Sequence, residues 1–169
     1  MIARAALVIG TVMLAAVIIQ LTFLGRLGLP GATPDLVVVC VVALALALGP
    51  TAGAMAGFVG GLLLGVAPPA DGYLGLSALV FVVIGYLAGK VIDPRDRSIW
   101  LIMGIVGLST SGAVLGTALI SAVVGSERIS WEAVPALALT SALYGVLLAP
   151  LVVPPIGKLA RTLVSELAT

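Results

Sequence analysis

Charged residues are confined to short segments of this chain, and that distribution limits its possible folds more than any other feature. Eight basic and seven acidic residues are spread over 169 positions, 62% of the residues are hydrophobic, and the mean hydropathy is +1.32. A soluble domain carries about 25% charged residues, against 9% here. Once each apolar run is given the length that a helix needs to cross a bilayer, only connections of about ten residues or fewer remain. The sequence therefore predicts an all-α, polytopic integral membrane protein without a soluble domain.

We predict a six-helix transmembrane bundle that forms one transmembrane domain over residues 1–169. The predicted spans are residues 5–24, 34–48, 50–66, 73–91, 99–124 and 134–153. The first apolar run is too long for a signal peptide, which is the alternative interpretation, and no small-residue cleavage site followed by a soluble chain comes after it. Gly49 and Pro50 break the helix between the second and third spans, for which a re-entrant pair is the rival geometry.

The C-terminal segment follows the sixth span, which is predicted to end between Pro150 and Pro155. Residues 157–169 place leucines four positions apart beside two basic residues. This pattern predicts a short amphipathic helix that lies on the cytoplasmic surface of the membrane.

Basic residues are divided unevenly between the two predicted sides of the membrane. With six spans and the N-terminus inside, the cytoplasmic side holds Arg4, Lys90, Arg95, Arg97, Lys158 and Arg161. The outer side holds Arg26 and Arg128. Because basic residues are enriched in cytoplasmic segments, this division predicts a multi-pass protein with both termini in the cytoplasm.

Glycine recurs at every fourth position through the third predicted span. The row includes Gly49, Gly53, Gly57 and Gly61, and shorter rows follow on the next two spans at Gly85, Gly89, Gly112 and Gly116. Positions four apart form one ridge of a helix, and here the ridge carries no side chains. In lipid, such a ridge lets another helix approach closely. We therefore predict that these glycines lie at helix contacts, either within the bundle or with a partner protein, and that the third span is a packing core.

Polar side chains within the predicted spans are few. Gln20, near the end of the first span, is expected to form a hydrogen bond to another helix. Ser109, Thr110 and Ser111 are expected to bond back to carbonyls of their own helix. Cys40 lies in an apolar run and is expected to be a small buried residue.

Chemistry-bearing residues are absent from the predicted membrane interior. The sequence contains no histidine, and no acid or base lies near the middle of a span. Because charges at membrane depth mark proton relays and ion paths, a proton-coupled transporter is disfavoured. An intramembrane protease lacks its paired catalytic residues, and a metal site lacks ligands. We expect no enzyme and no cofactor, and the net charge of +1 gives no indication of nucleic-acid binding.

A lipid-linked glycosyltransferase is a further enzyme class to consider, because such enzymes usually need acidic residues in an outer loop. The acidic residues in the predicted outer segments are Asp35, Asp71, Glu127 and Glu132. They form no recognisable motif, so we expect them to cap helices and solvate loops.

Several short motifs cluster between residues 30 and 89. They are Pro34, Asp35 and Leu36; Leu48, Gly49 and Pro50; Gly53, Gly57 and Phe58; Gly61, Leu62 and Leu63; Pro68, Pro69, Ala70 and Asp71; Leu74, Gly75 and Leu76; and Gly85, Tyr86, Leu87, Ala88 and Gly89. These motifs resemble the family of rod-shape-determining membrane proteins called MreD, and the proline-rich turn is similar to that of actinobacterial members. The family commonly has an aspartate after its Gly-Leu-Leu segment, where this chain has Gly65, so no role of that acid carries over.

The resemblance implies a non-enzymatic protein of the bacterial plasma membrane that acts in lateral cell-wall elongation. Its implied partners are MreC, the RodA glycosyltransferase, a class B penicillin-binding protein and, in many bacteria, the MreB filament. The implied role is a scaffold or regulator that binds MreC, positions peptidoglycan synthases and so controls rod shape.

The family's bundle is similar to the substrate-binding component of energy-coupling-factor vitamin transporters. That similarity supplies the alternative function, a small-molecule binding subunit of a membrane transporter. Such a site needs convergent polar groups in a pocket, and the outer loops offer few of them.

Overall fold

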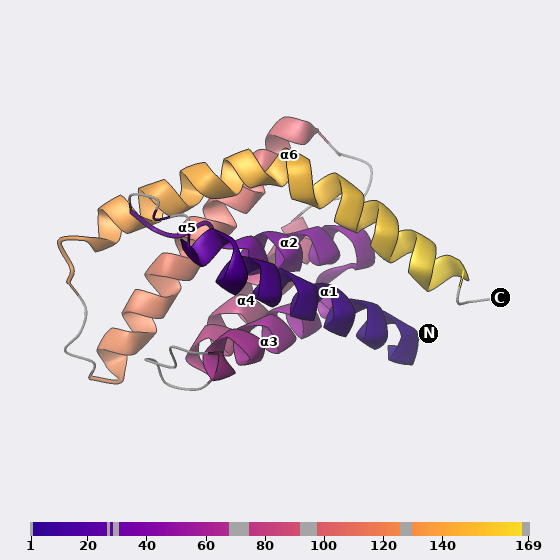
Figure 1. Ribbon diagram of the computed structural model, residues 1–169, viewed down its shortest axis with the longest axis horizontal. Helices are drawn as coiled ribbons and strands as arrows, with labels where there is room; N and C mark the ends of the chain where they lie inside the picture. The colour runs from indigo at the N-terminus through magenta and orange to yellow at the C-terminus, as the bar shows by residue number, and fades with distance from the viewer. Residues whose placement is uncertain are drawn as a thin grey trace.

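The computed structural model is a bundle of α-helices and describes residues 2–26, 28, 31–67, 75–91, 98–125 and 130–166 (Figure 1). The helices are α1 (Ile2–Thr22), α2 (Leu36–Leu48), α3 (Pro50–Val66), α4 (Leu76–Val91), α5 (Ile99–Val123) and α6 (Val134–Glu166), and a 3-10 turn, η1 (Leu24–Arg26), follows α1. Since every element over these ranges is helical, the predicted all-α class is confirmed. Sequence predictions that fall outside the described residues concern the turn over 68–71, the start of the fourth span at 73–74, Arg95, Arg97, Glu127, Arg128 and the end of the tail at 167–169.

Three of the helices are long and apolar enough to cross a membrane: Ala5–Arg26, Ile99–Val123 and Val134–Val164. The other three are apolar but shorter, with 13 residues in α2, 17 in α3 and 16 in α4. At 1.5 Å per residue, α2 is about 20 Å long, less than the hydrocarbon thickness of about 30 Å. Three helices are therefore consistent with a membrane location, and the presence of six spans stays a prediction.

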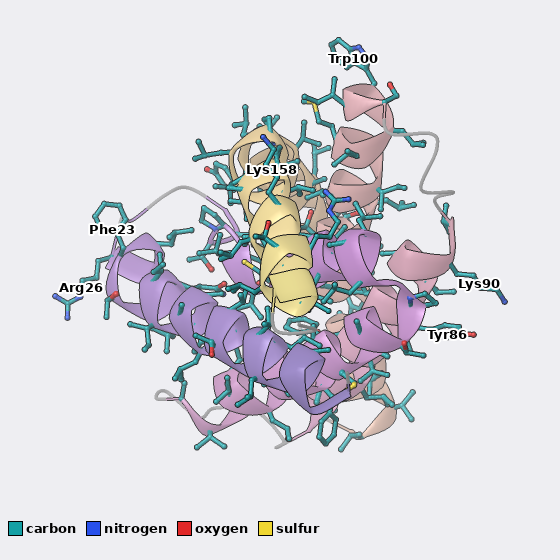
Figure 2. The ribbon with its side chains drawn as sticks, turned by 90° about the vertical axis from the view of Figure 1, so that its right-hand side faces the viewer. Phe23, Arg26, Tyr86, Lys90, Trp100 and Lys158 are labelled. Atoms are coloured by element: carbon teal, nitrogen blue, oxygen red, sulfur yellow. The ribbon has the colours of Figure 1, made fainter. Side chains whose placement is uncertain are left out.

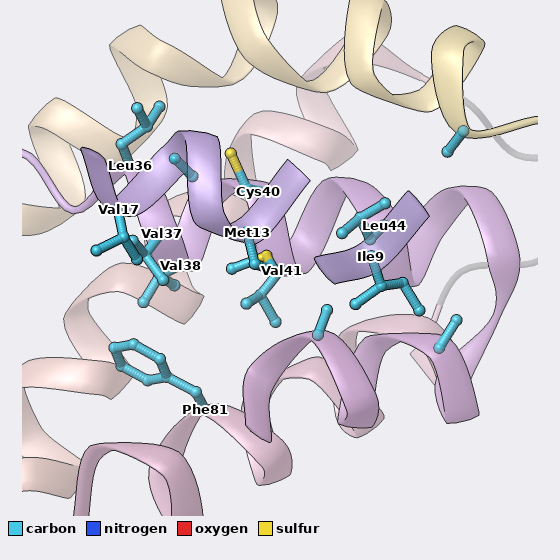
Figure 3. Close-up of a cluster of buried hydrophobic side chains, with 14 of the residues drawn as sticks. Ile9, Met13, Val17, Leu36, Val37, Val38, Cys40, Val41, Leu44 and Phe81 are labelled. Carbon is cyan, nitrogen blue, oxygen red and sulfur yellow. The ribbon is translucent and has the colours of Figure 1, made fainter. Parts of the chain in front are cut away.

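The short helix α2 is the centre of the bundle and contacts each of the other five helices. All residues from Leu36 to Ala45 are buried. Figure 3 shows this core, in which Ile9 and Met13 of α1 lie over Val41 and Leu44 of α2. The sequence LVVVCVVALALAL is apolar on every face, and a helix of that kind is buried on every face. The helix at the centre of the bundle is therefore α2, while α3, which carries the glycine row, packs closely against α4.

Helix ends gather at two opposite ends of the bundle. At one end, Gly89 of α4 lies against Pro50 at the start of α3, and Gly157 of α6 faces Ala47 of α2. Figure 1 shows that α1 begins and α6 finishes at this same end. We call it the basic end after its basic side chains, Lys90, Lys158 and Arg161.

The opposite end is marked by the start of α2. There, Gln20 near the end of α1 reaches the first turn of α2. Arg26 follows in the turn after α1 and points away from the bundle (Figure 2). We call this the Asp35 end, after the residue that precedes α2. Of the described basic side chains, Arg26 lies here and the others lie toward the basic end.

The helix α6 continues to Glu166, so the predicted helix end between residues 150 and 155 is wrong. Three prolines in that segment lie inside the helix. Each removes one backbone hydrogen bond and bends the helix, and Figure 1 shows α6 arching over the bundle there. After the bend, Ala160 is fully buried and Leu163 packs against the core. Residues 157–166 of the segment predicted as a separate surface helix are thus part of α6 and pack on the bundle.

Candidate functional site

Glycines of α3 and α4 bring the two helices into backbone contact. The glycines that face backbone of the opposite helix are Gly53, Gly57, Gly61, Gly85 and Gly89. A methyl group added at Gly57 would collide with the carbonyl of Phe81, and Gly53 and Gly85 each face the other's carbonyl. Residues without side chains permit this approach, which membrane helices use in place of a hydrophobic driving force. The structure therefore places most of the predicted row at a contact inside the bundle.

Gly49 has a different role from the rest of the row. It ends α2 with a φ of +97°, a conformation that residues with a Cβ rarely adopt. Within the described residues, no atom lies within 4 Å of a Cβ placed at Gly49. Pro50 follows at the first position of α3, where no N–H donor is needed. The predicted helix break is confirmed. Gly49 sets its turn, and its backbone lies against Gly89 of α4, where an added Cβ would be 2.9 Å from the carbonyl carbon of Gly49.

Glycines on α5 lie in two kinds of surroundings. A Cβ placed at Gly116 would be 3.0 Å from Cγ1 of Val80 in α4, which is a tight contact with a side chain. Among the described residues, a Cβ placed at Gly104 or Gly112 meets no atom within 4 Å. Gly112 was predicted at a helix contact, and the bundle itself supplies none.

A groove of about 230 Å³ runs between α4 and α5 beside Gly112. Its lining residues are Ile84, Leu87, Ala88, Val91, Ile105, Leu108, Ser109 and Gly112. Leu87 is 51% exposed and Leu108 is 76% exposed, so the rim of the groove lies open to the surroundings. The groove is apolar except for the hydroxyl of Ser109, as expected of a surface that meets lipid or another membrane helix.

Gln20 and Asp35 together satisfy the first N–H groups of α2. Asp35 is the N-cap residue, and its carboxylate accepts a hydrogen bond from the Val38 N–H at 3.2 Å. Oε1 of Gln20 accepts from the Val37 N–H at 2.8 Å. These N–H groups have no partner inside their own helix. The predicted capping role of Asp35 and the predicted helix-to-helix hydrogen bond of Gln20 are both confirmed.

Buried hydroxyls connect α5 to α6. Thr110 is fully buried and donates to the carbonyl of Gly107 at 3.0 Å, and Ser111 donates to the same carbonyl at 3.1 Å. Ser141 of α6 donates to the carbonyl of Thr110 at 3.2 Å. Gly145 leaves room for the Thr110 side chain, whose Oγ1 would lie 2.5 Å from an added Cβ. The predicted bonding to their own helix is confirmed for Thr110 and Ser111, whereas Ser109 forms no side-chain hydrogen bond within the described residues.

A cavity of about 460 Å³ lies at the Asp35 end, between the α3–α4 pair and the α5–α6 pair. Leu64, Phe81 and Leu137 contribute to its apolar wall. Its polar lining consists of Asp35, Ser77, Thr117, Ser121 and Ser130. Asp35 was expected as a helix cap, whereas the four hydroxyl residues were not predicted as site residues, because polar groups were expected only in the outer loops. The available signal was the spacing of Thr117 and Ser121, because positions four apart share one helix face.

The remaining residues of the family motifs lie at helix starts and on the surface. Pro34 is buried beside Asp35, and Gly75 precedes α4 with a φ of +90°. Tyr86 is 43% exposed, and Nζ of Lys90 lies 5.9 Å from its ring centroid. Figure 2 shows both side chains pointing outward from the bundle.

Comparisons of the whole chain with known protein families, curated proteins and solved structures find no match.

Proposed function

We propose that this chain is a non-enzymatic scaffold of the bacterial cell-wall elongation complex. In this role it binds MreC and positions the RodA glycosyltransferase and a class B penicillin-binding protein, with the MreB filament as a further partner. The motif resemblance over residues 30–89 points to this complex, and the α4–α5 groove offers a surface for one of its members.

The groove is the observation that carries the proposal. It extends from Ile84 to Val91 on α4 and from Ile105 to Gly112 on α5, about two helical turns on each. Glycines of the α3–α4 contact already face another helix, whereas Gly112 faces none in the described part of the chain. A partner with a single membrane helix matches this surface, because a small residue lets the partner's backbone approach.

The proposal includes a topology with six spans and both termini in the cytoplasm. The basic end would then face the cytoplasm, since basic residues are enriched on that side. The shorter helices α2, α3 and α4 would be accommodated by local thinning of the bilayer. Ser98 precedes α5, whose first residues include the exposed Trp100 (Figure 2). Labelling of a Ser98→Cys variant from outside intact cells would overturn this orientation.

Co-purification with MreC in mild detergent tests the scaffold function. We expect Gly112→Leu to abolish recovery of MreC, because the leucine side chain fills the position where the partner backbone approaches. The variant should keep the elution volume and melting temperature of the wild type, since no described atom lies within 4 Å of the added Cβ. Gly10→Leu on α1 is the matched control, because its added Cβ also meets no atom within 4 Å. Gly85 does not suit this test, since it faces Gly53 inside the bundle.

Two different results would contradict the role of the groove and the scaffold function separately. Wild-type recovery of MreC by Gly112→Leu would remove the groove from the proposal. Failure of the wild-type protein to bind MreC, together with tight capture of a vitamin-like ligand, would move the assignment to a transporter subunit.

A further inference from the structure

The cavity at the Asp35 end gathers polar groups from segments that are far apart in the sequence. Asp35 comes from the start of α2, Ser77 from α4, Thr117 and Ser121 from α5, and Ser130 from the segment before α6. Its volume of about 460 Å³ falls within the range of about 300–1,000 Å³ that is typical of small-molecule sites. Within the described residues, α3 and α4 do not pack against α6, and the cavity occupies the space that this leaves.

Two hydroxyls that line this cavity, those of Thr117 and Ser121, differ from the hydroxyls of Thr110, Ser111 and Thr140. Thr110 and Ser111 of α5, like Thr140 of α6, donate to carbonyls of their own helix. Thr117 and Ser121 form no side-chain hydrogen bond within the described part of the protein, although each has a helix carbonyl three and four positions earlier. Hydroxyls in membrane helices usually make that bond. These two are therefore available to a molecule in the cavity.

Asp35 supplies the only charge among the described residues that line the cavity. Its carboxylate accepts from the Val38 N–H and also interacts with the Gln20 side chain and the Val37 N–H. The two oxygens of a carboxylate together offer about four acceptor positions, so one stays open to a ligand. The described basic side chains nearest in sequence belong to Arg26 and Lys90, and neither lines the cavity. A ligand that brings a positive charge would compensate this carboxylate.

We propose that this cavity binds a small molecule or lipid headgroup through an ammonium group. The three N–H donors of a primary ammonium match the Asp35 carboxylate and the hydroxyl oxygens of Thr117 and Ser121. The wall formed by Leu64, Phe81 and Leu137 accommodates the apolar body that carries the ammonium. This site is separate from the α4–α5 groove, so it does not depend on the scaffold proposal.

The first experiment measures thermal unfolding of the full chain in nanodiscs of phosphatidylglycerol, titrated with phenethylamine. Phenethyl alcohol, which has a similar shape without the positive charge, is the matched ligand control. We expect a saturable rise in melting temperature with phenethylamine and none with the alcohol. Asp35→Asn keeps an N-cap side chain but removes the charge, and it should weaken phenethylamine binding by about tenfold or more.

A second variant keeps the test decisive if Asp35→Asn does not fold. Replacing Thr117 with valine and Ser121 with alanine removes the free hydroxyls without touching the α2 cap, and it should also weaken phenethylamine binding. Ser109→Ala in the α4–α5 groove is the control and should bind like the wild type. Equal responses to amine and alcohol, equal binding by wild type and variants, or no saturable response would each overturn the phenethylamine arm.

Native mass spectrometry distinguishes a lipid headgroup from a free amine. The protein is reconstituted with equal amounts of phosphatidylethanolamine and phosphatidylglycerol and then released from the membrane. Selective retention of phosphatidylethanolamine by the wild type, lost in Asp35→Asn, would identify the ligand as a lipid headgroup. Binding of phenethylamine without lipid retention would identify a free amine, and absence of both would reject the site.

Discussion

The glycine rows of α3 and α5 share a sequence pattern but differ in their surroundings. Both carry glycines four positions apart, yet Gly53 and Gly57 press against the backbone of α4 while Gly112 meets no neighbouring atom in the described structure. In water, glycines in the interior of a helix only make that helix less stable. In a membrane it is a place where a second helix can lie close. The glycine pattern therefore marks where a close helix contact is possible, but it does not specify which helix forms that contact.

The largest expected difference between the two regions comes from leucine substitutions. Gly57→Leu should reduce stability by at least about 3 kcal/mol or prevent folding, because its side chain would occupy the position of the Phe81 backbone. Gly104→Leu on α5 adds the same side chain where no atom lies within 4 Å, and it should unfold like the wild type. Thermal unfolding in detergent, followed by size-exclusion recovery, measures both. If Gly57→Leu had wild-type stability, the close approach of α3 and α4 at Gly57 would not contribute to the stability of the bundle.

Alanine substitutions on α4 and α5 test the same difference in surroundings, with smaller expected changes in the free energy of unfolding. Gly85→Ala should cost about 1–3 kcal/mol, since its methyl group meets the carbonyl of Gly53 and the backbone cannot yield easily. Gly112→Ala should be neutral or slightly stabilising, because alanine has the higher helix propensity and finds open space. Denaturant unfolding curves of the two variants give the difference. If both substitutions had the same effect, the backbone contact would not limit stability.

The smallest expected effect concerns the contact between α5 and α6, which includes a hydrogen bond from a side chain. Ser141→Ala removes the bond from the Ser141 hydroxyl to the Thr110 carbonyl. Such bonds between membrane helices contribute about 0.6 kcal/mol on average, so the loss should be well below that of Gly85→Ala. The same unfolding measurement ranks the two variants. A larger loss for Ser141→Ala would show that the polar contact, and not the glycine fit, dominates the bundle.

Local chemistry was predictable from the sequence. Apolar runs of helical length gave the all-α class, and the apolar character of α1, α5 and α6 identified helices long enough to cross a membrane. The helix break at Gly49 and Pro50, the cap at Asp35 and the back-bonded hydroxyls were equally readable, because each depends on neighbours within four positions along the chain.

The extent of α6 and the position of α2 were decided by tertiary packing. Prolines normally end a helix, yet α6 continues through Pro150, Pro154 and Pro155 because its last turns pack on the core. The uniformly apolar sequence of α2 indicates burial, but its place among all five other helices depends on how those helices are arranged.

From the sequence alone follow an all-helical chain, helices apolar enough to cross a membrane, and glycine surfaces suited to close helix contacts. Only the tertiary structure decided that Gly85 is used inside the bundle while Gly112 is open, and that Asp35 shares a cavity with hydroxyls from distant segments. The physical reason is that lipid tails and buried side chains are equally apolar. Hydropathy therefore separates polar from apolar segments, but it cannot tell which apolar face meets lipid, another helix or a cavity.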